Sequence, residues 1–576
     1  MNIVRDLQIS QKIRDNLGLL SVLLLAGLLR GLLLTQKSPH FDEGVYGFFV
    51  QEIWRRGFFP YDPSNFHGPI YYYTLQIAEQ IFGKGVFAFR LVSGVISSLS
   101  VYYVWRMNEF FGEVAIWVAL ALAVSPAAVF YSRYTMHESM FILFQILFAF
   151  HYFRYLQKPN SKSAILMGIF AALLFANKET TVIFLFCFLF ASFLTKLIEN
   201  LVSKERPPAG FAKTLKKAFE KTMGSLKGAN KQNLKNIGLS VGVAILAICF
   251  IFSGFGTEGG RIYDFVKAYS FWTKTGVQHV SGHEKPFVYW FELLLRYEWP
   301  AFVGLLLSPL LIFFGSKSAR FFSLFAVGNL LAYAIIPYKT PWCILGITWP
   351  LCFVTGFAMA GMHSFKFFQA ISFRKNTEDA GTHYRSRRAS AMLGLLVCFV
   401  SLGMAVRLNF FQYHNTSEPY VYVQSSGDIN SISEIIESRV QKFPEDLNMA
   451  ILIALKATWP FPWTLSNFKH LSYREIFDED TKKKDSPELK AQKEQLASAD
   501  IIMVDLVDEA KTEKQISKKY FKSQFKVRDS YSICSIFFSS EKFQLSDLEF
   551  AQAKSSGGEI SNMKFSLVGP VGATGE

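Results

Sequence analysis

Apolar runs of about 15 to 20 residues recur along the first two thirds of the chain and then stop near residue 406. A helix needs about 20 mainly apolar residues to cross the hydrocarbon core of a bilayer. The pattern therefore predicts a polytopic α-helical membrane domain over residues 1–408. The eleven predicted spans are Leu17–Thr35, Val86–Trp105, Ala115–Tyr131, Met140–Leu156, Ala164–Ala176, Thr181–Ile198, Ile237–Phe255, Pro300–Phe314, Phe321–Ile336, Trp342–Met362 and Ala391–Val406.

After Asn409 the pattern changes to short apolar runs that alternate with charged, helix-like segments. Such alternation is typical of a small soluble α/β domain, predicted here over residues 409–554. The expected strands are Tyr420–Gln424, Met449–Leu455, Ile501–Leu506 and Ser532–Phe538, and the expected helices are Ser431–Val440 and Pro487–Leu496. The polar, glycine-rich residues 555–576 are expected to be a flexible tail.

The net charge of +15 comes largely from short loops between the spans. Glu199–Asn236 and His363–Ser390 are the most basic of them, and the positive-inside rule places such loops in the cytoplasm. This orientation puts the N-terminus in the cytoplasm of a multi-pass protein of the cytoplasmic (inner) membrane. It puts the loops 36–85 and 256–299 and the C-terminal domain outside. Orientation accounts for the charge, and no nucleic-acid-binding motif is present.

An acidic pair, Asp42-Glu43, follows the first span directly and lies among aromatic residues such as Tyr46. It is either an ordinary solvated pair at a helix end or a functional one. A carboxylate close to lipid is costly unless it is paired or used, and desolvation raises its proton affinity, which suits a general base. We predict one site at the outer membrane face that combines this pair with the cluster at His67, with Asp42 as base and Glu43, Tyr46 and His67 orienting it or the acceptor.

Several ionisable residues at other outer turns are candidates for the same site. Arg133, Lys178, Lys339 and His283 are predicted to bind a lipid phosphate, because preorganised cations stabilise phosphate charge. The alternatives are an interfacial Arg133 whose head group reaches water, and a Lys178 that simply pairs with its neighbour. Glu138 and Glu179 are candidates for a supporting role. His279, His283 and Glu284 are a candidate divalent-metal set, which Gly282 and Pro286 weaken because they disfavour a helix.

Taken in order, these motifs resemble the dolichyl-phosphate-mannose protein mannosyltransferase superfamily, which includes the bacterial aminoarabinose transferases of lipid A. The first-loop Asp of that superfamily corresponds to Asp42, and its His-Pro-Pro-Leu stretch to His67–Ile70, with Gly68 in place of a proline. The chain is most similar to an archaeal and bacterial branch named for flippase-associated activity. The motifs shared with that branch are Asp42-Glu43-Gly44, His67-Gly68-Pro69, Asn177-Lys178-Glu179-Thr180, Gly282-His283-Glu284-Lys285-Pro286, Tyr297-Glu298-Trp299-Pro300 and Pro460-Phe461-Pro462-Trp463.

The resemblance implies an integral-membrane glycosyltransferase of the GT-C fold, similar to families GT39 and GT83. Such an enzyme moves a sugar, with inversion, from a polyprenyl-phosphate donor to a glycan, lipid or protein acceptor. The resemblance implies Asp42 as the base. The alternative is a non-catalytic membrane protein that helps to flip or hand over a lipid-linked sugar. A secondary transporter is a weaker alternative because the chain lacks an inverted repeat.

Overall fold

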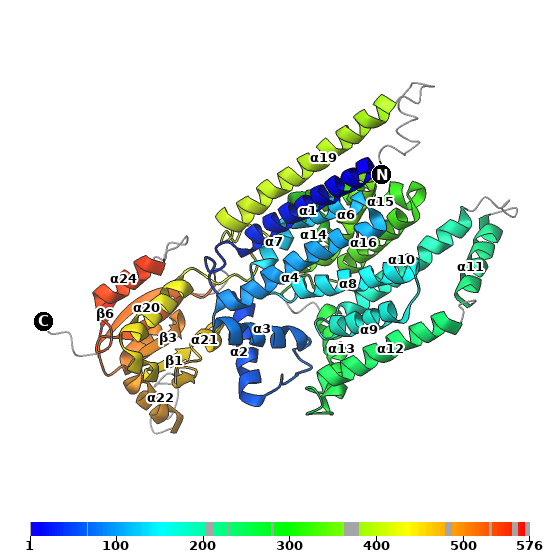
Figure 1. Ribbon diagram of the computed structural model, residues 1–576. Coiled ribbons are helices and arrows are strands. Elements are labelled where there is room, and N and C mark those ends of the chain that lie inside the picture. The colour runs from blue at the N-terminus through cyan, green and yellow to red at the C-terminus, as the bar shows by residue number, and fades with distance from the viewer. Residues whose placement is uncertain are drawn as a thin grey trace. The chain divides into compact units, whose positions relative to one another are not determined.

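The computed structural model (Figure 1) describes residues 2–65, 67–202, 211–227, 231–277, 282–361, 380–477, 487–528, 533–555 and 563–570. Contacts between residues divide the chain into two compact units. The first comprises Met1–Leu32, Arg56–Phe82 and Ala88–Gln412. The second comprises Leu33–Arg55, Gly83–Phe87 and Tyr413–Glu576. Because two early segments belong to the second unit, that unit is discontinuous in sequence.

The regular elements of the first unit are all helices among its described residues. Its elements are α1 (Asn2–Gly31), α3 (Ile70–Phe82), α4 (Val86–Arg106), α5 (Asn108–Phe111), α6 (Glu113–Val124), α7 (Pro126–Ser132), α8 (Glu138–Gln157), α9 (Ser161–Phe175), α10 (Thr181–Leu201), α11 (Phe211–Lys227), α12 (Lys231–Phe252), α13 (Arg261–Val277), α14 (Tyr289–Tyr297), α15 (Trp299–Phe314), α16 (Lys317–Ile335), η1 (Pro341–Ile344), α17 (Leu345–Gly361), α19 (Ala380–Val406) and η2 (Arg407–Phe411).

Seven helices among the described residues are long and apolar enough to cross a membrane, or eight if the bent pair α6 and α7 forms one span. Three further apolar helices are shorter: Asn16–Gly31, Ser161–Phe175 and Trp299–Phe314. Large apolar side chains on α12, such as Ile245, Leu246 and Phe250, are exposed, as expected of a surface that faces lipid. The chain is therefore a multi-pass membrane protein, while the number of eleven spans stays a prediction.

The predicted span Ala115–Tyr131 differs from expectation, because α6 and α7 meet at an angle of 56°. Pro126 has no N–H to donate to the preceding turn, so the helix breaks there. Arg30 on α1 donates instead to the carbonyl oxygens of Leu122 and Ala123, both at 2.9 Å. On the other side of the break, Glu298 accepts from the Ala127 N–H at 2.7 Å. Arg30 and Glu298, both buried, thus form hydrogen bonds with main-chain groups that lose their helical partners at the break.

The helices pack in an order that brings distant segments of the chain together. α9 contacts both α8 and α12, and α10 contacts α16. α17 packs against α6, α15 and α16. The short links that precede α8, α10 and η1 all carry polar residues, and the site described below is built from these links.

The second unit contains one six-stranded mixed sheet, with strand order β2-β1-β3-β5-β4-β6. The strands β1 (Ala450–Ala454), β2 (His470–Tyr473) and β3 (Ile501–Asp505) are parallel, and β4 (Tyr520–Lys526), β5 (Ile533–Ser539) and β6 (Ser566–Val568) join them in antiparallel pairs. The helices of this unit are α2 (Phe41–Arg56), α20 (Asp428–Lys442), η3 (Pro444–Asn448), α21 (Phe461–Thr464), α22 (Pro487–Ser498), α23 (Leu506–Gln515) and α24 (Leu545–Ser555). Figure 1 shows α20 and α24 on the same side of the sheet, and the two helices contact each other.

The expected strand at Tyr420–Gln424 is wrong, because this segment is irregular. Val423 has a φ of 55°, which an extended strand does not allow. The other three expected strands and both expected helices are confirmed within a few residues. Sequence analysis missed β2, β4 and β6, and β6 falls within the residues 555–576 that were expected to be a tail.

The helix α2 packs on the aromatic stretch Trp459–Trp463 within the second unit. A Cβ at Gly44 would lie 2.7 Å from the Cα of Pro460, and one at Gly47 would lie 2.2 Å from the ring of Trp463. Both glycines therefore allow a contact too close for any side chain. Part of this stretch, Pro460–Trp463, is one of the motifs of the sequence resemblance, and here it packs within its own unit.

Candidate functional site

The two acidic residues of α2 have different environments. Glu43 is fully buried, and its carboxylate accepts the N–H of His40 at 2.8 Å. His40 precedes the helix by one residue, so this contact satisfies an N–H at the helix start in the manner of a capping box. Asp42 is the more accessible member of the pair, with 26% of its side chain exposed. The carboxylate of Glu43 thus caps the helix, and that of Asp42 is partly accessible.

His40 fixes the main chain beside Asp42. The Asp42 N–H donates to Nδ1 of His40 at 3.1 Å, so that nitrogen carries no proton. The other nitrogen, Nε2, therefore donates to the carbonyl oxygen of Tyr422 at 2.8 Å. The Asp42 carboxylate lies 3.8 Å from Nδ1 and accepts no hydrogen bond from any described residue. Its lone pairs remain available for an incoming hydroxyl group.

In the first unit, two motifs that lie about 110 residues apart in sequence are joined through their main chains. The Gly68 N–H donates to the carbonyl oxygen of Asn177 at 3.2 Å, and the Ile70 N–H donates to that of Ala176 at 3.1 Å. A Cβ at Gly68 would lie 2.1 Å from the Ala176 oxygen. Glycine at this position is explained by the close approach of the two chains.

We expect Gly68→Ala to separate the two motifs, because the added methyl group meets main-chain atoms that cannot move independently. The variant should lower the thermal unfolding midpoint of the purified protein by several degrees, as an overpacking cost of about 1–3 kcal/mol implies. Gly242→Ala is the matched control, since a Cβ there meets nothing within 4 Å. Equal midpoints for the two variants would contradict the close approach.

Five ionisable side chains form one cluster at this junction. Nδ1 of His67 lies 3.1 Å from Oε2 of Glu179, and Nζ of Lys178 is ion-paired with Glu138. The ring of His137 lies 4.2 Å from that of His67. The side chains of Glu138, Lys178 and Glu179 are at most 5% exposed. The structure therefore brings together His67, Glu138, Lys178 and Glu179, all of which were candidates from the sequence.

Two buried charges in this cluster, those of Lys178 and Glu179, are supported by their neighbours. Burial opposes the charge of Lys178, but Cys343, Glu138 and Glu179 offset it and hold the pKa of Lys178 well above its usual range. Burial also opposes the charge of Glu179, and His67 together with Lys178 lowers the pKa of this carboxyl below its usual value. Lys178 is therefore a fixed cation and Glu179 a fixed anion near neutral pH.

The cluster lines a cavity of about 390 Å³ that lies wholly within the first unit. His67, Lys178 and Glu179 contribute its charged groups. Its other walls come mainly from aromatic and apolar side chains of α13, α14, α16 and the turn before α17, among them Trp272, Trp290, Tyr333, Tyr338 and Trp342. The cavity is thus apolar on most sides and ionic on one.

The other predicted cations have main-chain partners. Arg133 donates to the carbonyl oxygens of Leu29 and Leu32 and lies over the ring of Phe410. Lys339 donates to the carbonyl oxygens of Lys285 and Ile336, at 3.0 and 2.5 Å. Both residues therefore support the ends of neighbouring segments, and their binding of phosphate stays a prediction.

The proposed metal set is only partly described. His279 lies outside the described residues. The ring of His283 lies 5.1 Å from that of Tyr338, and Glu284 forms an isolated β-bridge with Tyr338. No group of three or more His, Cys, Asp or Glu residues within the described part of the chain could hold a metal ion.

Sequence reasoning did not single out several residues of these sites. Cys343 was not among the candidates, yet its sulfur lies 3.5 Å from Nζ of Lys178 and it lines the cavity. His40 carried no motif of its own. Trp272 lies on α13, within the segment 256–299 that was expected to be an outer loop. The sequence signal that could have linked Cys343 to the predicted site is its position four residues after the candidate Lys339.

Residues 66–211 match the model of the family described as dolichyl-phosphate-mannose-protein mannosyltransferase. No curated protein matches the chain significantly. Among solved structures, ArnT from Cupriavidus metallidurans in the apo state is similar, with 12% identity and a TM-score of 0.54 over 93% of this chain and 99% of that chain. The same protein bound to undecaprenyl phosphate gives 12% identity and a TM-score of 0.53 over 92% and 98% of the two chains.

The arabinofuranosyltransferase AftD from Mycobacteria is also similar, with 11% identity and a TM-score of 0.50 over 92% of this chain and 40% of that chain. At identities of 11–12% the similarity to solved structures establishes a shared fold. This structural similarity extends over nearly the whole chain, including the residues on either side of the segment that matches the family model.

Proposed function

Starting from a chain with the GT-C fold of membrane glycosyltransferases, we propose that the protein is an inverting glycosyltransferase. It takes a sugar from a polyprenyl-phosphate donor and moves it to a glycan, lipid or protein acceptor. Solved proteins of the same fold support this donor class, since ArnT from Cupriavidus metallidurans was solved with undecaprenyl phosphate bound. We also propose that, among enzymes of this fold, the protein is similar to families GT39 and GT83.

The observation that carries the proposal is the cavity of the first unit. A polyprenyl phosphate has an apolar chain and an anionic head, and this cavity offers apolar aromatic walls beside the cation Lys178. Lys178 is kept charged by Glu138 and Glu179, so it can meet the phosphate without changing its protonation state. His67 adds a second positive group when it is protonated, and Glu179 then stabilises that charge at 3.1 Å.

The chemistry needs one base. Asp42 removes the proton from the acceptor hydroxyl while the oxygen attacks the anomeric carbon. The bond between that carbon and the phosphate oxygen breaks, and polyprenyl phosphate leaves with the electron pair. The accessible carboxylate of Asp42 and the absence of a hydrogen-bond donor to it among the described residues support this role. Glu43 has an indirect role, because its carboxylate accepts the His40 N–H and so fixes the start of the helix that carries Asp42.

The orientation of the protein in the membrane is part of the same proposal. The exposed lysines Lys213, Lys216, Lys217 and Lys221 on α11, between two apolar helices, support a cytoplasmic position for that loop in the cytoplasmic membrane. The N-terminus then lies in the cytoplasm, and the sheet domain lies outside.

The test is release of polyprenyl phosphate by the purified full-length protein in lipid nanodiscs. A panel of undecaprenyl- and dolichyl-phosphate hexoses and pentoses serves as donor, with water or an added glycan as acceptor. Release that depends on protein concentration supports a glycosyltransferase. Saturable binding of a donor without release contradicts the enzymatic proposal and supports the non-catalytic handover role.

A further inference from the structure

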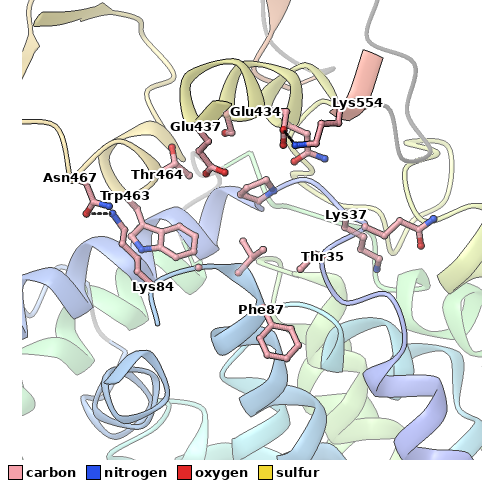
Figure 2. Close-up of a pocket in the computed structure, with 16 residues that line it drawn as sticks. Thr35, Lys37, Lys84, Phe87, Glu434, Glu437, Trp463, Thr464, Asn467 and Lys554 are labelled. Atoms are coloured by element: carbon pink, nitrogen blue, oxygen red, sulfur yellow. Dashed lines mark hydrogen bonds and ion pairs between the residues drawn. The ribbon is translucent and has the colours of Figure 1, made fainter. Parts of the chain in front are cut away.

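A second and larger cavity, of about 670 Å³, lies wholly within the second unit (Figure 2). Its walls come from the segment before α2, the start of α4, and the helices α20, α21 and α24. The volume is within the range of about 300–1,000 Å³ that small-ligand sites occupy. None of its lining residues is used by the proposed transfer chemistry.

Three lysines and two glutamates line this cavity: Lys37, Lys84, Lys554, Glu434 and Glu437. Nζ of Lys554 lies 2.6 Å from the carboxylate of Glu434. Nζ of Lys84 donates to the hydroxyl of Ser466 at 2.6 Å and to the side-chain oxygen of Asn467 at 3.0 Å. Figure 2 shows the Lys554–Glu434 ion pair and the Lys84–Asn467 hydrogen bond at opposite ends of the cavity. The amines of Lys84 and Lys554 are therefore already bound to oxygen atoms of the protein, and the buried Lys37 also has an interaction within the protein.

Glu437 projects from α20 toward the space between these pairs (Figure 2). Burial and the neighbouring Glu434 raise the pKa of this carboxyl above its usual value, against the opposing effect of Lys554 and Lys84. Glu437 is exposed on α20, so the cavity holds an accessible carboxyl group that offers hydrogen-bond acceptors.

Neutral polar groups and an aromatic surface complete the lining. Asn430, Thr464 and Asn467 offer amide and hydroxyl groups that can both donate and accept. Phe87 lines the same cavity and is 46% exposed. An exposed aromatic ring beside acceptors and amides matches a ligand that has one apolar face and a rim of hydroxyl groups.

We propose that this cavity binds a saccharide, with the ring of Phe87 against a sugar face and Glu437 accepting from sugar hydroxyls. A polyprenyl chain would leave the polar groups of the lining without partners, and a phosphate would meet amines that already interact with protein groups. The inference rests on the proposed function for its biological meaning: the saccharide is then the acceptor, or the part of the acceptor next to the new bond.

Saccharide binding is tested by calorimetry on the full-length protein in nanodiscs, without any donor. The probes are mannobiose, chitobiose and digalacturonic acid, with glycerol 3-phosphate as an anionic probe that resembles a lipid head group. We expect at least one disaccharide to bind saturably in the millimolar range or tighter. Glu437→Gln and Phe87→Ala should each weaken that binding at least tenfold. Glu445→Gln is the matched control, because Glu445 is exposed and does not line the cavity.

The outcomes separate this inference from the proposed function. No binding of any disaccharide, or binding that both cavity variants leave unchanged, overturns the saccharide site. Binding of glycerol 3-phosphate in place of the disaccharides overturns it in favour of a lipid head group. Disaccharide binding by a protein that releases no polyprenyl phosphate supports the site and counts against the transferase, and release without disaccharide binding does the reverse. Thermal unfolding of each variant shows whether it remains folded.

Discussion

The Asp42→Asn variant should release polyprenyl phosphate about 10²–10⁴-fold more slowly than the wild type, which is the usual loss when a general base is removed. Asparagine has nearly the same shape as aspartate, and the Asp42 N–H can still donate to His40. The start of α2 should therefore be unchanged, and the thermal unfolding midpoint should stay close to that of the wild type. Initial rates of release at saturating donor are the measurement.

Two other carboxylates on the same helix serve as comparisons. Glu52→Gln changes a residue that is ion-paired with Arg55 near the far end of α2, and it should leave release unaffected. Glu43→Gln keeps an oxygen that accepts from His40 but buries an additional amide, so it should act mainly on stability. Release by Asp42→Asn at the wild-type rate would contradict the role of Asp42 as base.

Lys178→Met should destabilise the first unit by about 3–5 kcal/mol, because it leaves the carboxylate of Glu138 buried without its counter-ion. The same variant should lose release of polyprenyl phosphate, since the cation beside the cavity is gone. Thermal unfolding in detergent and initial rates of release measure the two effects. Lys213→Met is the control, because Lys213 is an exposed lysine on α11.

The double variant Glu138→Gln/Lys178→Met separates structure from function. It removes both members of the buried pair, so most of the lost stability should return. Release should remain low, because the phosphate still lacks its cation. A double variant that regains full release would show that Lys178 acts only as the partner of Glu138. A single variant as stable as the wild type would contradict the buried ion pair.

The sequence predicted much of the cluster around His67, and the reason is chemical. Lys178 and Glu179 lie between two apolar runs, where an ionisable residue is costly and therefore has a partner or a use. The partners themselves could not be predicted, since Glu138 and His67 are 40 and 112 residues away along the chain from Lys178 and Glu179. The family resemblance supplied the order of the motifs but not their contacts.

Other features required the three-dimensional structure. The break at Pro126 was read as part of a continuous span, because hydropathy averages over a window and does not detect a missing N–H. The expected strand at Tyr420–Gln424 has a strand-like composition, but Val423 adopts a positive φ there. The different environments of Asp42 and Glu43 are equally hidden in sequence, since adjacent residues on a helix point to different sides.

Arg30 has a consequence for how the protein is made. Its guanidinium group binds carbonyl oxygens that are synthesised 92 and 93 residues later, at the end of α6. When α1 first reaches the bilayer these partners do not yet exist, so Arg30, which lies in the last turn of α1, has to reach water at the membrane interface. We expect the newly made α1 to remain near the membrane surface or beside the insertion machinery until α6 follows it. The buried hydrogen bonds of Arg30 can therefore form only after α6 has been synthesised, so the final position of α1 depends on a later helix.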